Sequence, residues 1–83
     1  MTDTRVAIIS IIVETPEATM ELNNLLHEFG SYIIGRMGIP YREKGINVIC
    51  VVVDAPQTII SNISGKIGRL PGITAKTLYT KTL

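Results

Sequence analysis

Apolar residues occupy both faces of two predicted strands, Arg5–Val13 and residues 46–53. Both segments are rich in Val and Ile, whose branched side chains pack well on a pleated sheet surface. Each strand leads into a similar junction, Val13-Glu14-Thr15-Pro16 in the first case and Val53-Asp54-Ala55-Pro56 in the second. The pattern indicates a repeated strand–helix unit.

The first junction predicts a helix over residues 16–29. Thr15 can cap this helix through its hydroxyl, and Pro16 suits the first helical position, where the missing N–H would have no partner within the helix. We expect Gly30 to adopt the left-handed conformation that closes the last turn. The apolar face follows the i, i+3, i+4, i+7 spacing of one helical stripe. Its members are Leu22, Leu25, Leu26 and Phe29.

The second junction predicts a helix that follows Pro56 and ends by Gly68, where turn-forming residues begin. Its apolar stripe consists of Ile59, Ile60, Ile63 and Ile67. Glu14 and Asp54 hold equivalent places before the two helices. We expect each carboxylate to be stabilised by the exposed N–H groups of a helix N-terminus.

Two further strands are predicted, over residues 31–41 and 73–80. Gly35, Gly38 and Pro40 interrupt the first of them, which favours a bulged or edge strand. A polar turn over residues 42–45 joins it to the strand 46–53 as a hairpin. The strand 73–80 alternates polar and apolar residues and is predicted to be the other edge.

The order βαββαβ predicts an α+β protein with the ferredoxin-like fold, a four-stranded antiparallel sheet with two helices on one face. The two central strands are apolar on the other face as well. Leaving about four such side chains in water forfeits roughly 1.5–3 kcal/mol each, a total comparable with the stability of a whole domain. We therefore expect a homodimer or homotetramer that packs through the open face or the edge strands. The alternative is that these positions tolerate exposure.

The composition narrows the functional classes. Eighty-three residues make one domain, residues 1–83, and a net charge of +1 predicts no direct nucleic-acid partner and no membrane surface. The start of the chain lacks the pattern of a signal peptide, and the apolar run after Arg5 is too short to span a bilayer. One cysteine, Cys50, fits a reducing compartment, so the expected location is the cytoplasm.

No catalytic motif is present, and the sequence predicts a non-enzymatic protein without a cofactor. Cys50 lies mid-strand among Val and Ile, and we expect a small, inert core thiol. No metal site is predicted. His27 lies off the apolar stripe of its helix and is expected to face solvent, with a metal ligand shared across an oligomer interface as the alternative.

Residues 35–45 are the most unusual part of the chain. Two glycines flank Arg36, which offers a bidentate fork to a carboxylate or phosphate, while the glycines allow close approach of a small anion or another backbone. The alternative is an edge strand that a charge protects from aggregation. Glu14 could bind an amine if the loop after the first strand lines a pocket.

With these residues in place, the chain resembles the family of iron-only hydrogenase system regulators, which share the ACT-like form of the ferredoxin-like fold. The resemblance covers nearly the whole chain, and residues 32–45 are specific to that family. The matching runs are Ile11-Ile12-Val13-Glu14, Leu25-Leu26-His27-Glu28-Phe29-Gly30, Asp54-Ala55-Pro56, Tyr32 to Gly45, and Ser64 to Gly72.

The resemblance implies a regulatory or accessory role in anaerobic hydrogen metabolism, with another regulatory or maturation protein as a partner. ACT domains bind amino acids or similar small molecules at subunit interfaces, near the first strand–helix loop and an adjoining strand. Carried over to this chain, the ligand site is expected at Glu14, Thr15, Gly35, Arg36 and Gly38. We therefore expect sensing of a small ligand with a carboxylate. A structural subunit without a ligand and a metal-responsive sensor are the alternatives.

Overall fold

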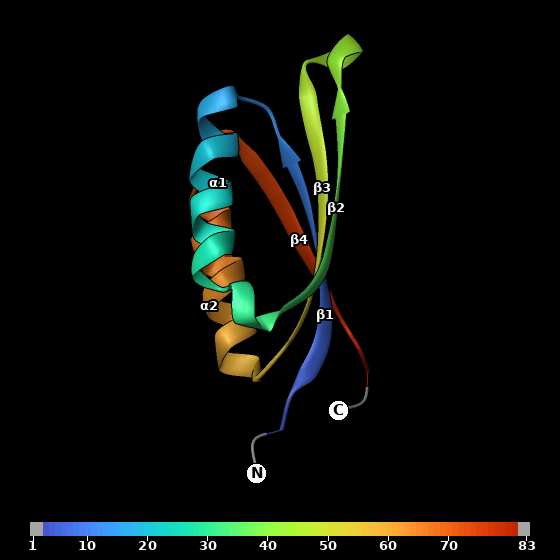
Figure 1. The fold of residues 1–83 in the computed structure, drawn as a ribbon, viewed down its shortest axis with the longest axis vertical. Helices are drawn as coiled ribbons and strands as arrows, with labels where there is room; N and C mark the ends of the chain where they lie inside the picture. Colours follow the sequence, from blue (N-terminus) through green and yellow to red (C-terminus); the bar gives the residue numbers. More distant parts are fainter. Residues whose placement is uncertain (1–2, 82–83) are drawn as a thin grey trace.

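Four strands and two α-helices follow one another in the predicted order βαββαβ, with the helices on one side of the sheet (Figure 1). The computed structural model describes residues 3–81. Two short 3₁₀ turns flank the second strand. The elements are β1 Arg5–Val13, α1 Pro16–Glu28, η1 Gly30–Tyr32, β2 Ile33–Tyr41, η2 Arg42–Lys44, β3 Ile46–Ala55, α2 Gln57–Gly68 and β4 Ile73–Tyr79.

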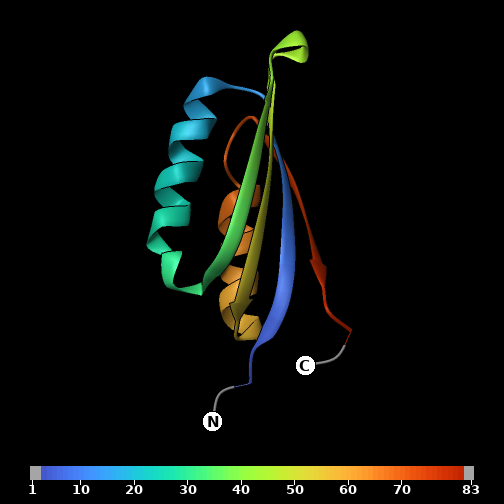
Figure 2. The ribbon, with the colours of Figure 1, turned by 45° about the vertical axis from the view of Figure 1, so that its right-hand side comes forward.

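The sheet is antiparallel throughout and has the strand order β2-β3-β1-β4. The two most apolar strands are therefore central, and β2 and β4 are the edges, as predicted. The register between β2 and β3 shifts between Ile33 and Gly35, which is the irregularity that the glycines of this strand predict. Seen from a second direction, both helices still lie on the same side of the sheet (Figure 2). The ferredoxin-like, ACT-like fold is confirmed.

The core lies between the helices and one face of the sheet, which we call the covered face. Leu25 and Ile59, at the margins of the two helical stripes, are only partly buried. The other stripe residues are buried against alternate residues of β1 and β3. The buried set is Ala7, Ile9, Ile11, Val13, Ala18, Leu22, Leu26, Phe29, Ile49, Val51, Val53, Ala55, Ile60, Ile63 and Ile67.

The helix ends follow the sequence in part. The hydroxyl of Thr15 accepts a hydrogen bond from the Ala18 N–H at 3.2 Å, which confirms the predicted cap of α1. The prediction for Asp54 is wrong, because β3 continues to Ala55 and the N-cap of α2 is Pro56, which offers no side-chain acceptor. Asp54 is instead an exposed strand residue opposite Val6.

The predicted left-handed conformation of Gly30 is also wrong. The chain enters η1 at that residue, so the helix is followed by a tighter turn and not by a left-handed cap. Among the described residues, the glycines with positive φ are Gly45 (66°), which ends the hairpin turn, and Gly72 (79°), which precedes β4. Both stand where the chain reverses direction into a strand.

The opposite face of the sheet carries no helix, and we call it the open face (Figures 1 and 2). It is apolar and substantially exposed: Leu78 is 68% exposed and Met37 61%. Cys50 lies on this face, opposite Ser10 and Met37, and is half-buried. The prediction of a core thiol is therefore wrong, because the register directs Cys50 away from the helices. The remaining apolar members are Val6, Ile8, Ile12, Ile39, Tyr41, Ile46, Val48 and Val52.

Candidate functional site

The β2–β3 hairpin extends beyond the helices (Figure 1). A groove lies between the covered face of the hairpin and the first half of α1. The groove consists of two adjoining hollows of about 370 and 220 Å³. Three residues line both of them: Thr19 from α1, Pro40 from β2 and Asn47 from β3. We call this the α1–hairpin groove.

Strand alternation decides which side chains of β2 enter the groove. Arg36, Gly38 and Pro40 pair with Val51, Ile49 and Asn47, the residues of β3 that face the helices. The glycine keeps the middle of the groove open, since it has no side chain to fill it. A Cβ at Gly38 would meet only a side-chain atom of Ile49, at 3.9 Å.

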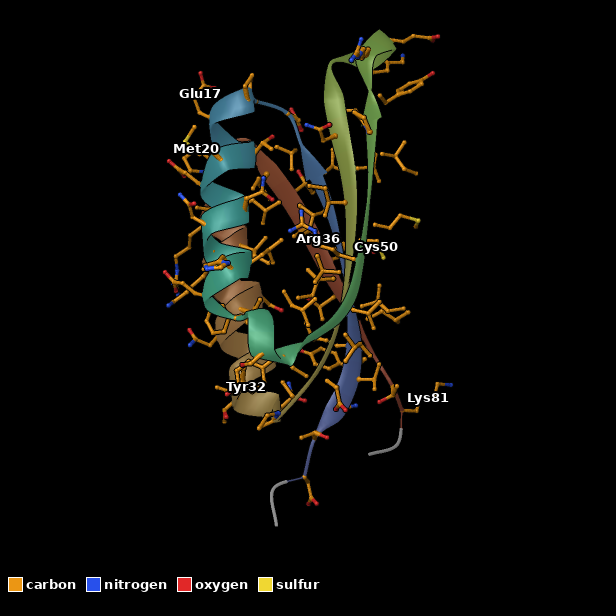
Figure 3. The ribbon with its side chains drawn as sticks, viewed as in Figure 1. Glu17, Met20, Tyr32, Arg36, Cys50 and Lys81 are labelled. Carbon is orange, nitrogen blue, oxygen red and sulfur yellow. The ribbon has the colours of Figure 1, made fainter. Side chains whose placement is uncertain are left out.

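Arg36 crosses the smaller hollow toward α1 (Figure 3). Its Nη2 donates a hydrogen bond to Oδ1 of Asn23 at 2.9 Å, and both side chains are exposed. Asn23 is a neutral acceptor, so this hydrogen bond orients the guanidinium without neutralising its charge. The free part of the guanidinium fork is suited to a carboxylate or phosphate.

The rest of the polar lining is neutral. Asn47 donates from Nδ2 to the hydroxyl of Thr19 at 3.4 Å, and the Thr19 hydroxyl is 3.4 Å from the backbone carbonyl of Thr15. Arg42 adds a second positive charge at the far end of the groove. Within residues 3–81, neither hollow is lined by an acidic side chain. The electrostatics of the groove therefore favour an anion over a cation.

The apolar lining comes from Val13, Pro16, Pro40 and Ile49. Three residues that the strand register assigns to the open face also border the groove: Ile39, Tyr41 and Ile46. Small-molecule sites usually combine such surface with a few polar groups that orient the ligand. The α1–hairpin groove has this character, with its charge at the two ends and hydrogen-bonding groups between them. A ligand with an anionic end and an apolar body matches it chemically.

Three of the five predicted ligand residues line this groove: Thr15, Arg36 and Gly38. Glu14 does not, and its side chain is exposed while its backbone N–H donates to the Gly72 carbonyl at 2.8 Å. Gly35 does not either, because it pairs with Val52 and belongs to the open face. The structure thus places Arg36 and Gly38 of β2 in the same groove as Thr15, the N-cap of α1, but leaves Glu14 outside it.

Three groove residues were missing from the sequence interpretation: Thr19, Asn23 and Asn47. A signal for two of them exists, because Thr15, Thr19 and Asn23 are spaced four residues apart and therefore lie along one side of α1. Asn47 is the one amide side chain of β3, and it lies on the face that the helices cover. These residues look like ordinary surface polar groups until the hairpin is placed beside them.

The alternative metal ligand, His27, is exposed in the last turn of α1. Cys50 lies on the other side of the sheet, so the fold does not bring the two together within one chain (Figure 3). Across residues 3–81, no three His, Cys, Asp or Glu side chains are grouped to hold a metal ion.

None of the described helices has the length and apolar character needed to cross a membrane.

The fold and the groove define a small ferredoxin-like protein of the ACT-like type, and the comparisons specify the family. A model of the TM1266-like family, described as "Iron-only hydrogenase system regulator, putative", matches residues 5–77. The chain belongs to this family.

Two solved structures resemble the chain. Uncharacterized protein TM1266 from Thermotoga maritima superposes with a TM-score of 0.91 at 34% identity, covering 95% of this chain and 100% of that one. The C-terminal domain of the MgtC protein from Mycobacterium tuberculosis has a TM-score of 0.72 at 9% identity, covering 93% of this chain and 88% of that one. The second likeness concerns the fold alone. No curated protein matches the chain.

Proposed function

We propose that this protein is a non-enzymatic, self-associating regulatory component of an iron-only hydrogenase system. It senses a small carboxylate-bearing molecule in the α1–hairpin groove. Membership in the TM1266-like family supports the regulatory role. The observation that carries the sensing proposal is the unneutralised guanidinium of Arg36, which Asn23 holds at 2.9 Å in a groove that acidic side chains, within the described part of the chain, do not line.

The ligand class follows from the lining. Arg36 binds the carboxylate through its fork, and the hydroxyl of Thr19 and the amides of Asn23 and Asn47 donate or accept hydrogen bonds along the body of the ligand. Proline and branched aliphatic side chains contact its apolar part. A small amino or keto acid with an aliphatic side chain has these features.

Sensing also requires that the ligand favours one state of the protein over another. Strand β2 provides the physical link, because alternate residues of this strand face opposite sides of the sheet. Arg36 and Gly38 face the groove, whereas Met37 and Ile39 belong to the open face. A ligand that fixes β2 against α1 also fixes the open face, and so changes how readily that face binds a partner.

A thermal-shift screen of amino and keto acids tests the sensing proposal. We expect at least one carboxylate to raise the melting temperature of the wild-type protein. The rise should disappear in Arg36→Ala and persist in Arg69→Ala, which removes an exposed arginine at the C-terminal end of α2 that lines neither hollow of the groove. Isothermal titration calorimetry on the same variants then measures the affinities. Stabilisation that is equal in both variants, or absent for every carboxylate, contradicts the proposal.

A second candidate function is a structural subunit that binds another regulatory or maturation protein and no small ligand. The exposed apolar open face favours it, because patches of this size on soluble proteins mark interaction sites. In this case the protein has no small-molecule response, and its regulatory effect depends on the open face alone. The thermal-shift screen separates the two functions.

A further inference from the structure

The open face has a pattern of bulky and small residues that is complementary to itself. We propose that two copies of the chain pack open face to open face about a two-fold axis that runs along the strands, between β1 and β3. The inference specifies the self-association that the proposed function includes and rests on it. The occupant of the open face is therefore a second copy of this chain.

The strand registers arrange the open face in rows that cross the sheet from β4 to β2. The row toward the hairpin holds Thr74, Ile12, Val48 and Ile39. The middle row holds Lys76, Ser10, Cys50 and Met37. The row toward the termini holds Leu78, Ile8, Val52 and Gly35. In every row the two edge positions differ strongly in size or polarity, whereas the two central positions are similar.

A two-fold axis along the strands exploits this asymmetry. It places β1 over β3 of the partner subunit and β4 over β2 of the partner subunit. A residue on one strand therefore faces the partner's residue from the same row on the opposite strand. Leu78, which is 68% exposed, then faces Gly35 of the partner, where no atom outside the two adjoining residues of the chain lies within 4 Å of a Cβ position. The largest protrusion of the row is matched with its emptiest position, as close packing between sheets requires.

The middle row is matched by the same operation. Lys76 faces Met37 of the partner subunit, so the aliphatic stem of the lysine packs on the thioether while its ammonium reaches the solvent at the sheet edge. Ser10 faces Cys50 of the partner, two small groups in the centre of the row. In the row toward the hairpin, Ile12 faces Val48 of the partner.

An axis across the strands produces a worse interface. It brings Lys76 of one subunit against Lys76 of the other, and two like charges meet in a surface that is otherwise apolar. It also places Ile39 over Gly35 and leaves Leu78 against the short Thr74. The charge and size pattern of the open face therefore selects the axis along the strands.

The area of the face is at the lower end of what a stable dimer buries. From their exposed fractions, Ile12, Met37, Ile39, Tyr41, Val48 and Leu78 together present on the order of 600 Å², and a standard protein interface buries about 800 Å² per partner. The half-buried residues between them supply part of the difference. A patch of this size on a monomer is at the upper end of what soluble proteins expose.

Sedimentation velocity from 1 to 100 μM tests whether the open face is the interface. We expect wild-type protein to be dimeric and Leu78→Asp to raise the dimer dissociation constant at least a hundredfold. The matched control is Met20→Asp, a residue of equal exposure (70%) on the outer side of α1, which should stay dimeric (Figure 3). Circular dichroism confirms that both variants are folded. A monomeric wild-type protein at 100 μM overturns self-association altogether, and equal weakening by both variants overturns the open face.

The axis is tested by the sign of a charge at position 37. If Met37 faces Lys76 of the partner, Met37→Glu forms an ion pair across the interface and Met37→Lys opposes a like charge. We expect the dissociation constant of Met37→Lys to exceed that of Met37→Glu by about tenfold or more. The difference should vanish in a Lys76→Met background. If wild-type protein dimerises but both charges weaken the dimer equally, the proposed axis is wrong while self-association stands.

Discussion

Val and Ile predominate on both faces of the central strands, but the two faces have opposite environments. On β1, Ile9 and Ile11 are 0% and 1% exposed beneath the helices, while Ile12, their neighbour on the open face, is 41% exposed. Val and Ile lie on both faces of β1, so residue type alone does not distinguish a core position from a surface one. What distinguishes them is whether the fold supplies a covering layer.

The chain carries more apolar surface than its two helices can cover. On the covered face, burial stabilises the monomer directly. On the open face, the same chemistry stabilises the protein only when a second surface removes it from water. If the open face pairs with a second copy as proposed, the covered face governs folding and the open face governs assembly, and substitutions on the two faces should act on different measurements.

The largest effect is expected on the covered face. Ile11→Ala removes a fully buried side chain and leaves a cavity, which lowers the free energy of unfolding by about 2–5 kcal/mol. The adjacent Ile12→Ala removes a side chain that is already 41% exposed in the monomer and should lower it by roughly 1 kcal/mol. Urea denaturation at one low protein concentration measures both values. Equal losses at the two positions would contradict the division between the faces.

Much of the fold could be predicted because the sequence signals are local and agree with one another. The helical stripes and the Thr15-Pro16 start each point to one structure, and the glycines of β2 mark an edge strand with an irregularity. Which alternate set of β1 or β3 faces the helices could not be predicted, since both sets are apolar. That ambiguity explains the error at Cys50.

The other two wrong predictions concern positions where the local sequence is compatible with more than one structure. Gly30 can close a helix in the left-handed conformation, but it can equally begin a 3₁₀ turn, and the tertiary path of the chain into β2 selects the turn. Asp54 precedes a helix in the sequence, but pairing of Ala55 with Arg5 extends β3 and keeps the carboxylate on the strand. At this position the additional strand pair outweighs the local preference of the carboxylate for the helix N-terminus.

The candidate site was predictable only in part for a similar reason. Arg36 and Gly38 stand out because of their unusual neighbours, and Thr15 because of its cap. Thr19 and Asn23 are ordinary polar residues of a helix surface, and their relation to Arg36 depends on where the hairpin lies. A contact between elements far apart in the sequence has no local signature.

A second test concerns the junction between the covered face and the groove. Gly72 has φ 79°, and a Cβ there would lie 2.8 Å from the Thr15 hydroxyl oxygen that caps α1. Gly72→Ala should therefore destabilise the fold by about 1–3 kcal/mol, through backbone strain and displacement of the cap. Gly45→Ala is the matched control, because Gly45 has φ 66° but no atom within 4 Å of a Cβ.

The two glycine variants should differ in their free energy of unfolding but have the same dimer dissociation constant. Strain alone makes Gly45→Ala less stable by about 1 kcal/mol, and the excess loss in Gly72→Ala measures the clash with Thr15. Neither residue belongs to the rows of the open face, so sedimentation should show unchanged dimerisation for both. A Gly72→Ala protein no less stable than Gly45→Ala would show that the cap tolerates the added methyl group.

The smallest expected effect is a rise of the melting temperature with protein concentration, because dimerisation stabilises the folded state by mass action. If the open face pairs only in the folded state, raising the protein concentration to about a hundred times the dimer dissociation constant stabilises each chain by about 1.5 kcal/mol. For a domain of this size, that corresponds to a melting temperature higher by about 6–12 °C. Differential scanning calorimetry across this concentration range measures the rise.

The variants then separate folding from assembly in one experiment. Leu78→Asp should melt at the same temperature at every concentration, since its open face no longer pairs. Ile11→Ala should melt lower throughout but keep the wild-type dependence on concentration, because its open face is intact. If Ile11→Ala lost that dependence while remaining folded, the covered face would also govern assembly, and the separation of roles between the two faces would fail.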